Sequence, residues 1–141
     1  MGALRRFLDR FTESDEERLA SSVQAWAATI PGTVRISEAP SRTPVALAVS
    51  VKRISLVPGD SYDSLEALLT DGTGEVLGVW TGRRSIPGMG LGTRMVVRGV
   101  LTKAAVARRM VNPAYEFVTF QSRGAHAPGF LLKKSPFVAD N

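Results

Sequence analysis

The residues with the clearest chemical potential lie close together near the middle of the chain. Trp80 is followed closely by Arg83 and Arg84, so a large flat ring lies beside concentrated positive charge. An aromatic ring can stack on an unpaired base, and guanidinium groups can bind the flanking phosphates. The pattern indicates a site for single-stranded nucleic acid. The alternative is that Trp80 is a core residue and the arginine pair belongs to a solvated loop.

Further basic and aromatic residues extend this pattern along the chain. Lysine and arginine neutralise phosphates, so a set of them on one surface binds a nucleic-acid backbone with an affinity that falls as salt rises. The candidate phosphate contacts are Lys52, Arg53, Arg83, Arg84, Arg98, Lys103, Arg108 and Arg109, and the candidate stacking rings are Trp80 and Tyr115. For both rings, a place in the core is the competing interpretation.

A β-hairpin is expected to position Trp80 and the two arginines that follow it. Residues 65–70 have strand character, residues 71–74 are Asp-Gly-Thr-Gly, and residues 75–80 are again rich in β-branched and aromatic side chains. Aspartate and glycine tolerate the positive φ of a tight turn. Two short strands joined by such a turn are typical of a hairpin.

The segment before the hairpin predicts a long, bent first strand. Apolar residues alternate over residues 45–51, and the alternation then changes phase to Ile54 and Leu56. Because successive residues of a strand point to opposite faces, this change indicates a bulge or a sharp coil at Lys52 and Arg53. Such a strand is expected where both halves of a small closed barrel share one strand.

Two further strands and several connections complete the predicted body. Alternating residues predict a fourth strand at 94–101 and a fifth at 115–120. The expected connections are a short edge strand within 33–37, a glycine-rich loop at 85–93, and a basic connection at 103–110 that is left open between a helical turn and a long hairpin arm. The tail is expected to be mobile or to dock on a partner.

The N-terminal segment predicts two helices. Residues 1–11 have an amphipathic pattern, and residues 14–30 begin with the spacing of a capping box and end at Pro31-Gly32. The first helix has apolar Leu4, Phe7, Leu8 and Phe11, with Arg5, Arg6 and Arg10 among its polar positions. It could lie on a membrane surface or pack on the domain or on a partner. Trp26 is expected to be a packing residue of the second helix.

Composition excludes several kinds of chemistry. The chain has no cysteine and a single histidine, His126, which excludes a disulfide framework, a thiolate zinc site, a cysteine nucleophile and a multi-histidine metal site. We expect no enzymatic activity, no cofactor and no metal. The net charge is +5, with 14 basic and 8 acidic side chains after residue 30 against 4 and 5 before it. The basic body favours a polyanionic partner.

The order of these motifs resembles a known group of proteins. The resemblance is carried by residues 65–67, 71–74, 79–84, 86–89, 92–99 and 112–116. The chain resembles small actinobacterial OB-fold nucleic-acid-binding-domain proteins, which are similar in turn to the OB domain of bacterial branch-migration helicases. The resemblance covers roughly residues 44–118 and implies an OB-fold and nucleic-acid binding.

The strand pattern itself favours the same architecture. Five strands with helical material before them, rather than between them, are typical of a small antiparallel Greek-key barrel. We therefore expect a mainly β chain: a five-stranded OB-fold barrel at 33–120, an amphipathic helical extension at 1–32, and a basic, flexible tail at 121–141.

Two functions follow from these expectations. The first is a non-catalytic module that binds single-stranded DNA or RNA with low sequence preference, across the second and third strands and the adjoining loops. The second is a protein-interaction or adaptor domain that uses residues 1–30 and the barrel as a scaffold, including one placed near a membrane. With no apolar run of membrane-spanning length and no secretory signal, a cytoplasmic location is expected.

Overall fold

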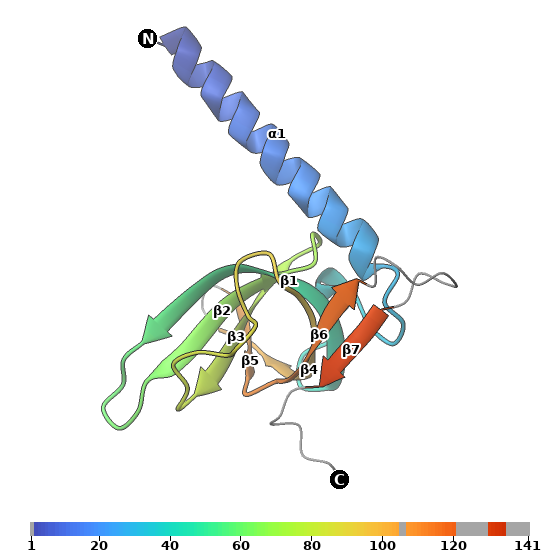
Figure 1. Cartoon of the computed structure of the whole chain (residues 1–141), viewed down its shortest axis with the longest axis vertical. Coiled ribbons are helices and arrows are strands. Elements are labelled where there is room, and N and C mark those ends of the chain that lie inside the picture. Colours follow the sequence, from blue (N-terminus) through green and yellow to red (C-terminus); the bar gives the residue numbers. More distant parts are fainter. Residues whose placement is uncertain (1, 105–106, 121–129, 135–141) are drawn as a thin grey trace.

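The computed structural model describes residues 2–104, 107–120 and 130–134, and the side chains of residues 15–104 and 107–118. Its elements are α1 (Gly2–Ala27), the 3-10 helix η1 (Ile36–Glu38), β1 (Pro44–Val57), β2 (Ser64–Thr70), β3 (Glu75–Thr81), β4 (Arg94–Thr102), β5 (Arg108–Val111), β6 (Ala114–Phe120) and β7 (Phe130–Lys134). Figure 1 shows a strongly curled sheet with α1 projecting away from it.

Five of the strands close into a ring. β1 pairs antiparallel with β2 and with β4, β2 pairs antiparallel with β3, β3 runs parallel to β5, and β5 pairs antiparallel with β4. β6 lies beside β4, and β7 lies beside β6, so the order is β1-β2-β3-β5-β4-β6-β7. The expectation of a mainly β chain with N-terminal helical structure is confirmed.

β1 closes the ring because it changes partner along its length. It pairs with β4 from Pro44 to Ser50 and with β2 from Ser50 to Val57. The register with β2 shifts between Val51 and Arg53, which confirms the bulge predicted from the change of alternation. An extra residue at this point bends the strand, so one strand serves both sides of the ring.

The predicted hairpin is also confirmed. β2 and β3 are in register from Ser64 opposite Thr81 to Thr70 opposite Glu75. The turn between them requires glycine, since Gly72 has a φ of 84° and side chains other than glycine are strained there. Local turn chemistry was therefore sufficient to define this part of the fold.

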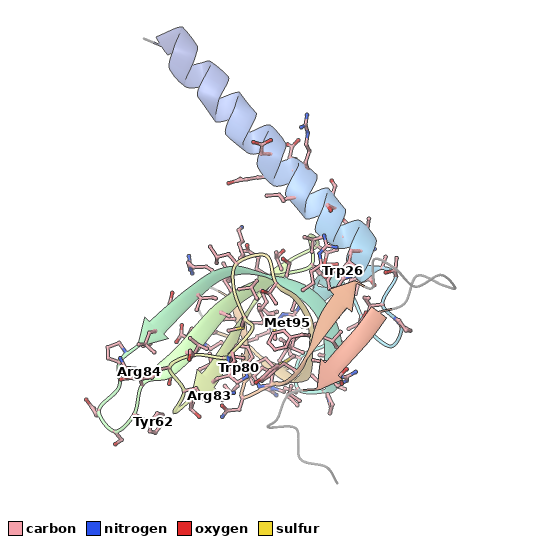
Figure 2. The ribbon with its side chains drawn as sticks, in the orientation of Figure 1. Trp26, Tyr62, Trp80, Arg83, Arg84 and Met95 are labelled. Atoms are coloured by element: carbon pink, nitrogen blue, oxygen red, sulfur yellow. The ribbon has the colours of Figure 1, made fainter. Side chains whose placement is uncertain are left out.

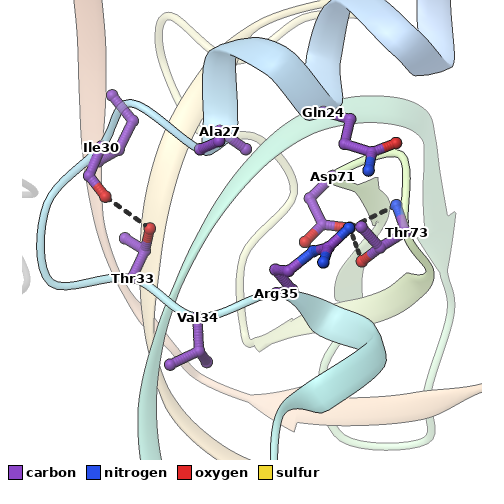
Figure 3. A pocket seen from close by; sticks show the side chains of 9 residues that line it. Gln24, Ala27, Ile30, Thr33, Val34, Arg35, Asp71 and Thr73 are labelled. Atoms are coloured by element: carbon purple, nitrogen blue, oxygen red, sulfur yellow. Dashed lines mark hydrogen bonds between the residues drawn. The ribbon is translucent and has the colours of Figure 1, made fainter.

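A buried carboxylate ties this turn to the segment before β1. Asp71 Oδ1 accepts hydrogen bonds from the N–H and the hydroxyl of Thr73, at 2.8 and 2.6 Å. Its Oδ2 accepts the N–H of Ile36 at 2.8 Å. Figure 3 shows Asp71 at one side of a hollow of about 330 Å³ that Gln24 and Ala27 of α1 also line. The turn and η1 thus meet at one carboxylate, beside a hollow that α1 also lines.

β5 and β6 form one interrupted partner of β4. Leu101 lies opposite Met110, and Arg98 lies opposite Ala114. Three steps along β4 therefore correspond to four steps along its partner, which places an extra residue between β5 and β6. Asn112, with a positive φ of 49°, lies at this point. The predicted fifth strand is β6, and β5 precedes it across this bulge.

The N-terminal segment differs from the expectation of two helices. It forms the single helix α1. No proline or glycine lies between residues 3 and 31, and without such a residue the capping-box sequence that begins at Ser14 continues the helix instead of starting a new one. No helix within the described ranges is both long enough and apolar enough to cross a membrane.

Two other expectations were wrong in part. The edge strand expected within 33–37 is replaced by η1, because the Ile36 N–H is bonded to Asp71 rather than to a strand. In the tail expected at 121–141, residues 130–134 form β7, which pairs with β6. The remainder of that tail, including His126, lies outside the described residues.

Apolar side chains fill the ring and also hold the helix. Leu47, Val49 and Val51 of β1 point into the main core, where they meet residues from β2 to β6. The alternate residue Ala48 faces outward and packs with Val23, Trp26 and Ile30 of the helical segment, together with Val96 and Val118, in a second cluster. The end of α1 is therefore fixed on the outer face of β1, β4 and β6.

Candidate nucleic-acid interface

The two rings predicted to stack on bases belong to the core. Trp80 is 3% exposed and Tyr115 is 1% exposed. The indole Nε1 of Trp80 donates a hydrogen bond to the Pro113 carbonyl at 3.1 Å. Stacking on a base requires an open ring face, which neither residue offers. This burial favours the competing interpretation of Trp80 and Tyr115 as core residues over a stacking role.

Arg83 and Arg84 leave the end of β3 and line a hollow of about 640 Å³ together with residues 112–115. Arg83 Nη1 donates a hydrogen bond to the Tyr115 hydroxyl at 3.2 Å. The guanidinium of Arg84 is mostly exposed and lies 3.6 Å from the carboxylate of Asp63. Figure 2 shows both arginines toward the end of the molecule opposite α1. Both remain candidates for phosphate contacts. Much of Arg84 is open to solvent, and Arg83 lines the hollow.

Arg98 and Arg108 have structural partners that the sequence did not reveal. Arg98 on β4 forms an ion pair with Glu116 of β6, whose side chain is nearly buried. Arg108 on β5 donates hydrogen bonds to the carbonyls of Ile36 and Ala39. Their assignment as free phosphate contacts is therefore not supported, because binding phosphate would break these contacts. The two residues hold the ring and the segment before β1 together.

Lys52 lies at the bulge of β1 and is also engaged. Its Nζ lies 2.7 Å from Glu75 Oε2. This hydrogen bond and charge, with a smaller contribution from Glu16 of α1, raise the pKa of Lys52 above its ordinary value. More than half of the lysine side chain stays exposed. Lys52 is therefore charged near neutral pH, but Glu75 offsets its attraction for phosphate.

A different row of residues forms an open basic surface. Arg53 of β1 lies opposite Leu68 of β2, Leu68 lies opposite Leu77 of β3, and Leu77 lies opposite Arg109 of β5. Paired residues share a face, so these four side chains cross the outer face of the ring in one line. The two exposed arginines lie about 14 Å apart by strand spacing. Among the described side chains, neither forms an ion pair.

A tyrosine that the sequence argument missed lies beside this row. Tyr62, in the loop between β1 and β2, is 57% exposed. It lines a hollow of about 380 Å³ with Pro58, Glu66, Val79 and Arg109. Figure 2 shows Tyr62 toward the same end of the molecule as Arg84. The available signal was its position: a lone aromatic residue within a polar loop, where no strand pattern requires a core side chain.

Two basic residues lie away from this surface or at its margin. Lys103 is exposed just beyond β4, next to residues 105–106, which lie outside the described ranges. Arg94 of β4 lies over the ring of Trp26 of α1, with its guanidinium carbon 5.0 Å from the ring centroid. The basic residues are thus distributed around the ring, and only some of them face the row from Arg53 to Arg109.

No protein family, curated protein or solved structure matches this chain. Within the described ranges, no group of three or more His, Cys, Asp or Glu side chains is placed to hold a metal ion. The surface that runs from Arg53 across Leu68 and Leu77 to Arg109, with Tyr62 at its border, is called the outer basic face below. It combines separated positive charges, half-buried apolar side chains and one open ring.

Proposed function

We propose that the ring is an OB-fold and that the chain is a non-catalytic module which binds single-stranded DNA or RNA on the outer basic face. The strand order supports the fold: a five-stranded ring in which β1 pairs with both β2 and β4, and β3 runs parallel to β5. OB-folds bind oligonucleotides on the face of their second and third strands with the adjoining loops. The outer basic face occupies this position.

One observation carries the proposal: Tyr62 and Arg109 line the same hollow on that face. An exposed ring can stack on a base of any type, while Arg109 and Arg53 bind the phosphates on either side. The half-buried Leu68 and Leu77 between them offer apolar contact for a second base. These contacts go to features that all nucleotides share, so little sequence preference is expected.

The test is a titration of fluorescently labelled single-stranded DNA and RNA at about 50 and 200 mM salt, read by anisotropy. The double variant Arg53→Gln, Arg109→Gln is compared with Arg35→Gln, Arg42→Gln, which removes the same charge from exposed positions near η1. Loss of two phosphate contacts should weaken binding about tenfold or more and reduce the salt slope by about 1.4 for a single strand.

The control pair should change the affinity by less than about twofold, because distant charges are screened at these salt concentrations. Equal effects of the two double variants would mean that the attraction comes from net charge alone and would remove the assigned face. If the unaltered protein binds neither nucleic acid at the lower salt concentration, the proposed function is wrong and the ring is a scaffold for a protein partner.

A further inference from the structure

We propose that the hollow at the end of β3 binds an organic phosphate monoester of about nucleotide size, with Arg83 and Arg84 holding the phosphate. The hollow has a volume of about 640 Å³ and lies between residues 80–85 and residues 112–115. Sites for small molecules have volumes of about 300–1,000 Å³. None of the residues that form the outer basic face lines this hollow, so the inference concerns a separate site and does not depend on the proposed function.

The lining of the hollow is apolar at its floor and polar at its rim. Trp80, Pro113 and Tyr115 line it and are buried, so only a small part of each side chain faces the hollow. Arg84 and Ser85 also line it and are exposed. An apolar wall with a few polar groups suits a ligand that has an apolar or flat body and one polar end. An inorganic ion would use the rim alone.

Arg83 is held in position by the core. Its Nη1 donates a hydrogen bond to the Tyr115 hydroxyl at 3.2 Å. The Tyr115 ring is itself fixed by edge-to-face contacts with Trp80 and Phe117, with centroid distances of 6.0 and 5.5 Å. A guanidinium that is already positioned loses little conformational freedom when a ligand binds, and this raises the affinity. Arg83 therefore supplies a positive charge at a defined place beside the hollow.

Arg84 supplies a second positive charge next to the first. Its side chain is 77% exposed, and its Nε lies 3.6 Å from Asp63 Oδ2. This distance is longer than a hydrogen bond, and an exposed ion pair of this kind contributes little to stability. An anionic ligand in the hollow can therefore compete with the Asp63 carboxylate for Arg84.

The two adjacent charges favour a phosphate monoester over other anions. A monoester carries a charge of about −1.5 to −2 at neutral pH and has three strong acceptor oxygens, so it can bind both guanidiniums at once. A phosphodiester within a strand carries a single charge, and the two oxygens of a carboxylate are satisfied by one guanidinium. A free nucleotide and the phosphorylated end of a strand present the same monoester, so both are sources of this ligand.

The test is a calorimetric titration of the full chain with thymidine monophosphate at about 150 mM salt, where distant charges are screened. We expect a Kd below about 1 mM. Thymidine, which lacks the phosphate, and inorganic phosphate, which lacks the apolar body, should each bind about tenfold more weakly or worse. Arg84→Gln should also weaken binding about tenfold. Arg35→Gln, which removes another exposed arginine with an acidic neighbour, should change the affinity by less than about twofold.

Two further variants test the parts played by Asp63 and Tyr115. Asp63→Asn removes the competing carboxylate and should tighten binding by about twofold or more. Glu38→Gln, which removes the carboxylate beside Arg35, should have no such effect. Tyr115→Phe keeps the ring in the core and removes the hydroxyl that positions Arg83, so it should weaken binding by about threefold or more. Unfolding curves confirm that each variant is folded at the temperature of the titration.

Oligothymidines that end in a phosphate or in a hydroxyl distinguish the two sources of the monoester. Tighter binding of the phosphorylated strand assigns the hollow to strand ends, and equal binding of the two strands assigns it to free nucleotides. Arg53→Gln with Arg109→Gln should leave binding of the monophosphate unchanged, so failure of the proposed function and failure of this inference are distinguishable. The inference is overturned if the monophosphate binds no more tightly than thymidine, or if Arg84→Gln and Arg35→Gln have equal effects.

Discussion

Trp80 and Tyr115 meet edge to face inside the ring, with their centroids 6.0 Å apart and their planes at 88°. This contact and the hydrogen bond from Trp80 Nε1 to the Pro113 carbonyl indicate that Trp80 stabilises the folded chain. We expect Trp80→Phe to lower the free energy of unfolding by about 1–3 kcal/mol, through lost volume and an unpaired carbonyl. Urea unfolding measures the change. Nucleic-acid affinity should be unaltered at a temperature where the variant is folded, and a loss of affinity there would return Trp80 to the binding site.

Tyr62 is expected to show the opposite behaviour. Its ring is exposed in a loop, so Tyr62→Ala should change the free energy of unfolding by less than about 0.5 kcal/mol. Removal of a stacking ring should weaken single-strand binding by about 1–3 kcal/mol. Tyr62→Phe keeps the ring and serves as the matched control, with nearly full affinity. Anisotropy titrations measure both, and equal losses in the two variants would point to the hydroxyl instead of stacking.

Arg108 and Arg109 are neighbours in sequence with opposite predicted roles. Arg108 donates hydrogen bonds to the carbonyls of Ile36 and Ala39, so Arg108→Gln should lower the free energy of unfolding by about 1–3 kcal/mol. Arg109→Gln should leave stability nearly unchanged and weaken nucleic-acid binding. Unfolding curves and titrations of the two single variants decide the assignment. It is contradicted if Arg108→Gln leaves stability unchanged.

Alanine substitutions at Gly72 and Gly82 distinguish the cost of backbone strain from the cost of a clash with α1. Both have positive φ, 84° and 73°, so alanine at either position should cost about 1–2 kcal/mol. A Cβ on Gly72 would lie 2.4 Å from the Ala20 carbonyl oxygen of α1, whereas nothing lies within 4 Å of one on Gly82. Gly72→Ala should therefore cost more than Gly82→Ala and also displace α1, which increased exposure of Trp26 fluorescence to quenchers would report.

The raised pKa of Lys52 leads us to expect that the stability of the chain depends on pH. Its pKa is raised in the folded chain, first by the hydrogen bond to Glu75, so its contribution is present below the unfolded value of about 10.4 and is lost as pH rises through the folded value. Because both side chains of the pair are partly exposed, Lys52→Met should cost less than about 1 kcal/mol at neutral pH. The difference should shrink as pH rises through the folded pKa of Lys52. Urea unfolding across this range measures it, and Glu75→Gln should abolish the same pH dependence.

Local patterns in the sequence were enough to predict the parts of the fold that local chemistry determines. The Asp-Gly-Thr-Gly turn and its flanking strands form the hairpin from Ser64 to Thr81. The change of alternation at Lys52 and Arg53 marks the bulge that lets β1 serve two partners. Both features depend on the period of a strand and on the φ of a few residues, which neighbouring residues in the sequence specify.

The site was predicted less well because its residues are defined by partners far along the chain. The arginine at position 108 is held by carbonyls about 70 residues earlier, and Arg98 by Glu116 on another strand. No spacing within a strand reveals such contacts. The burial of Trp80 likewise depends on the bulge that brings Pro113 to its indole. Tyr62 was missed because aromatic residues were sought in strands rather than in loops.

β7 gives the sheet a border that the ring itself does not have. β1, β2, β3, β5 and β4 each pair on both sides, whereas β7 pairs with β6 alone among the described strands. Its other backbone edge can accept a further strand, which is a common route to aggregation. This strand contains adjacent Lys133 and Lys134. Lysine on an edge strand is one of the features that oppose the addition of a further strand, so the sequence of β7 itself works against such pairing.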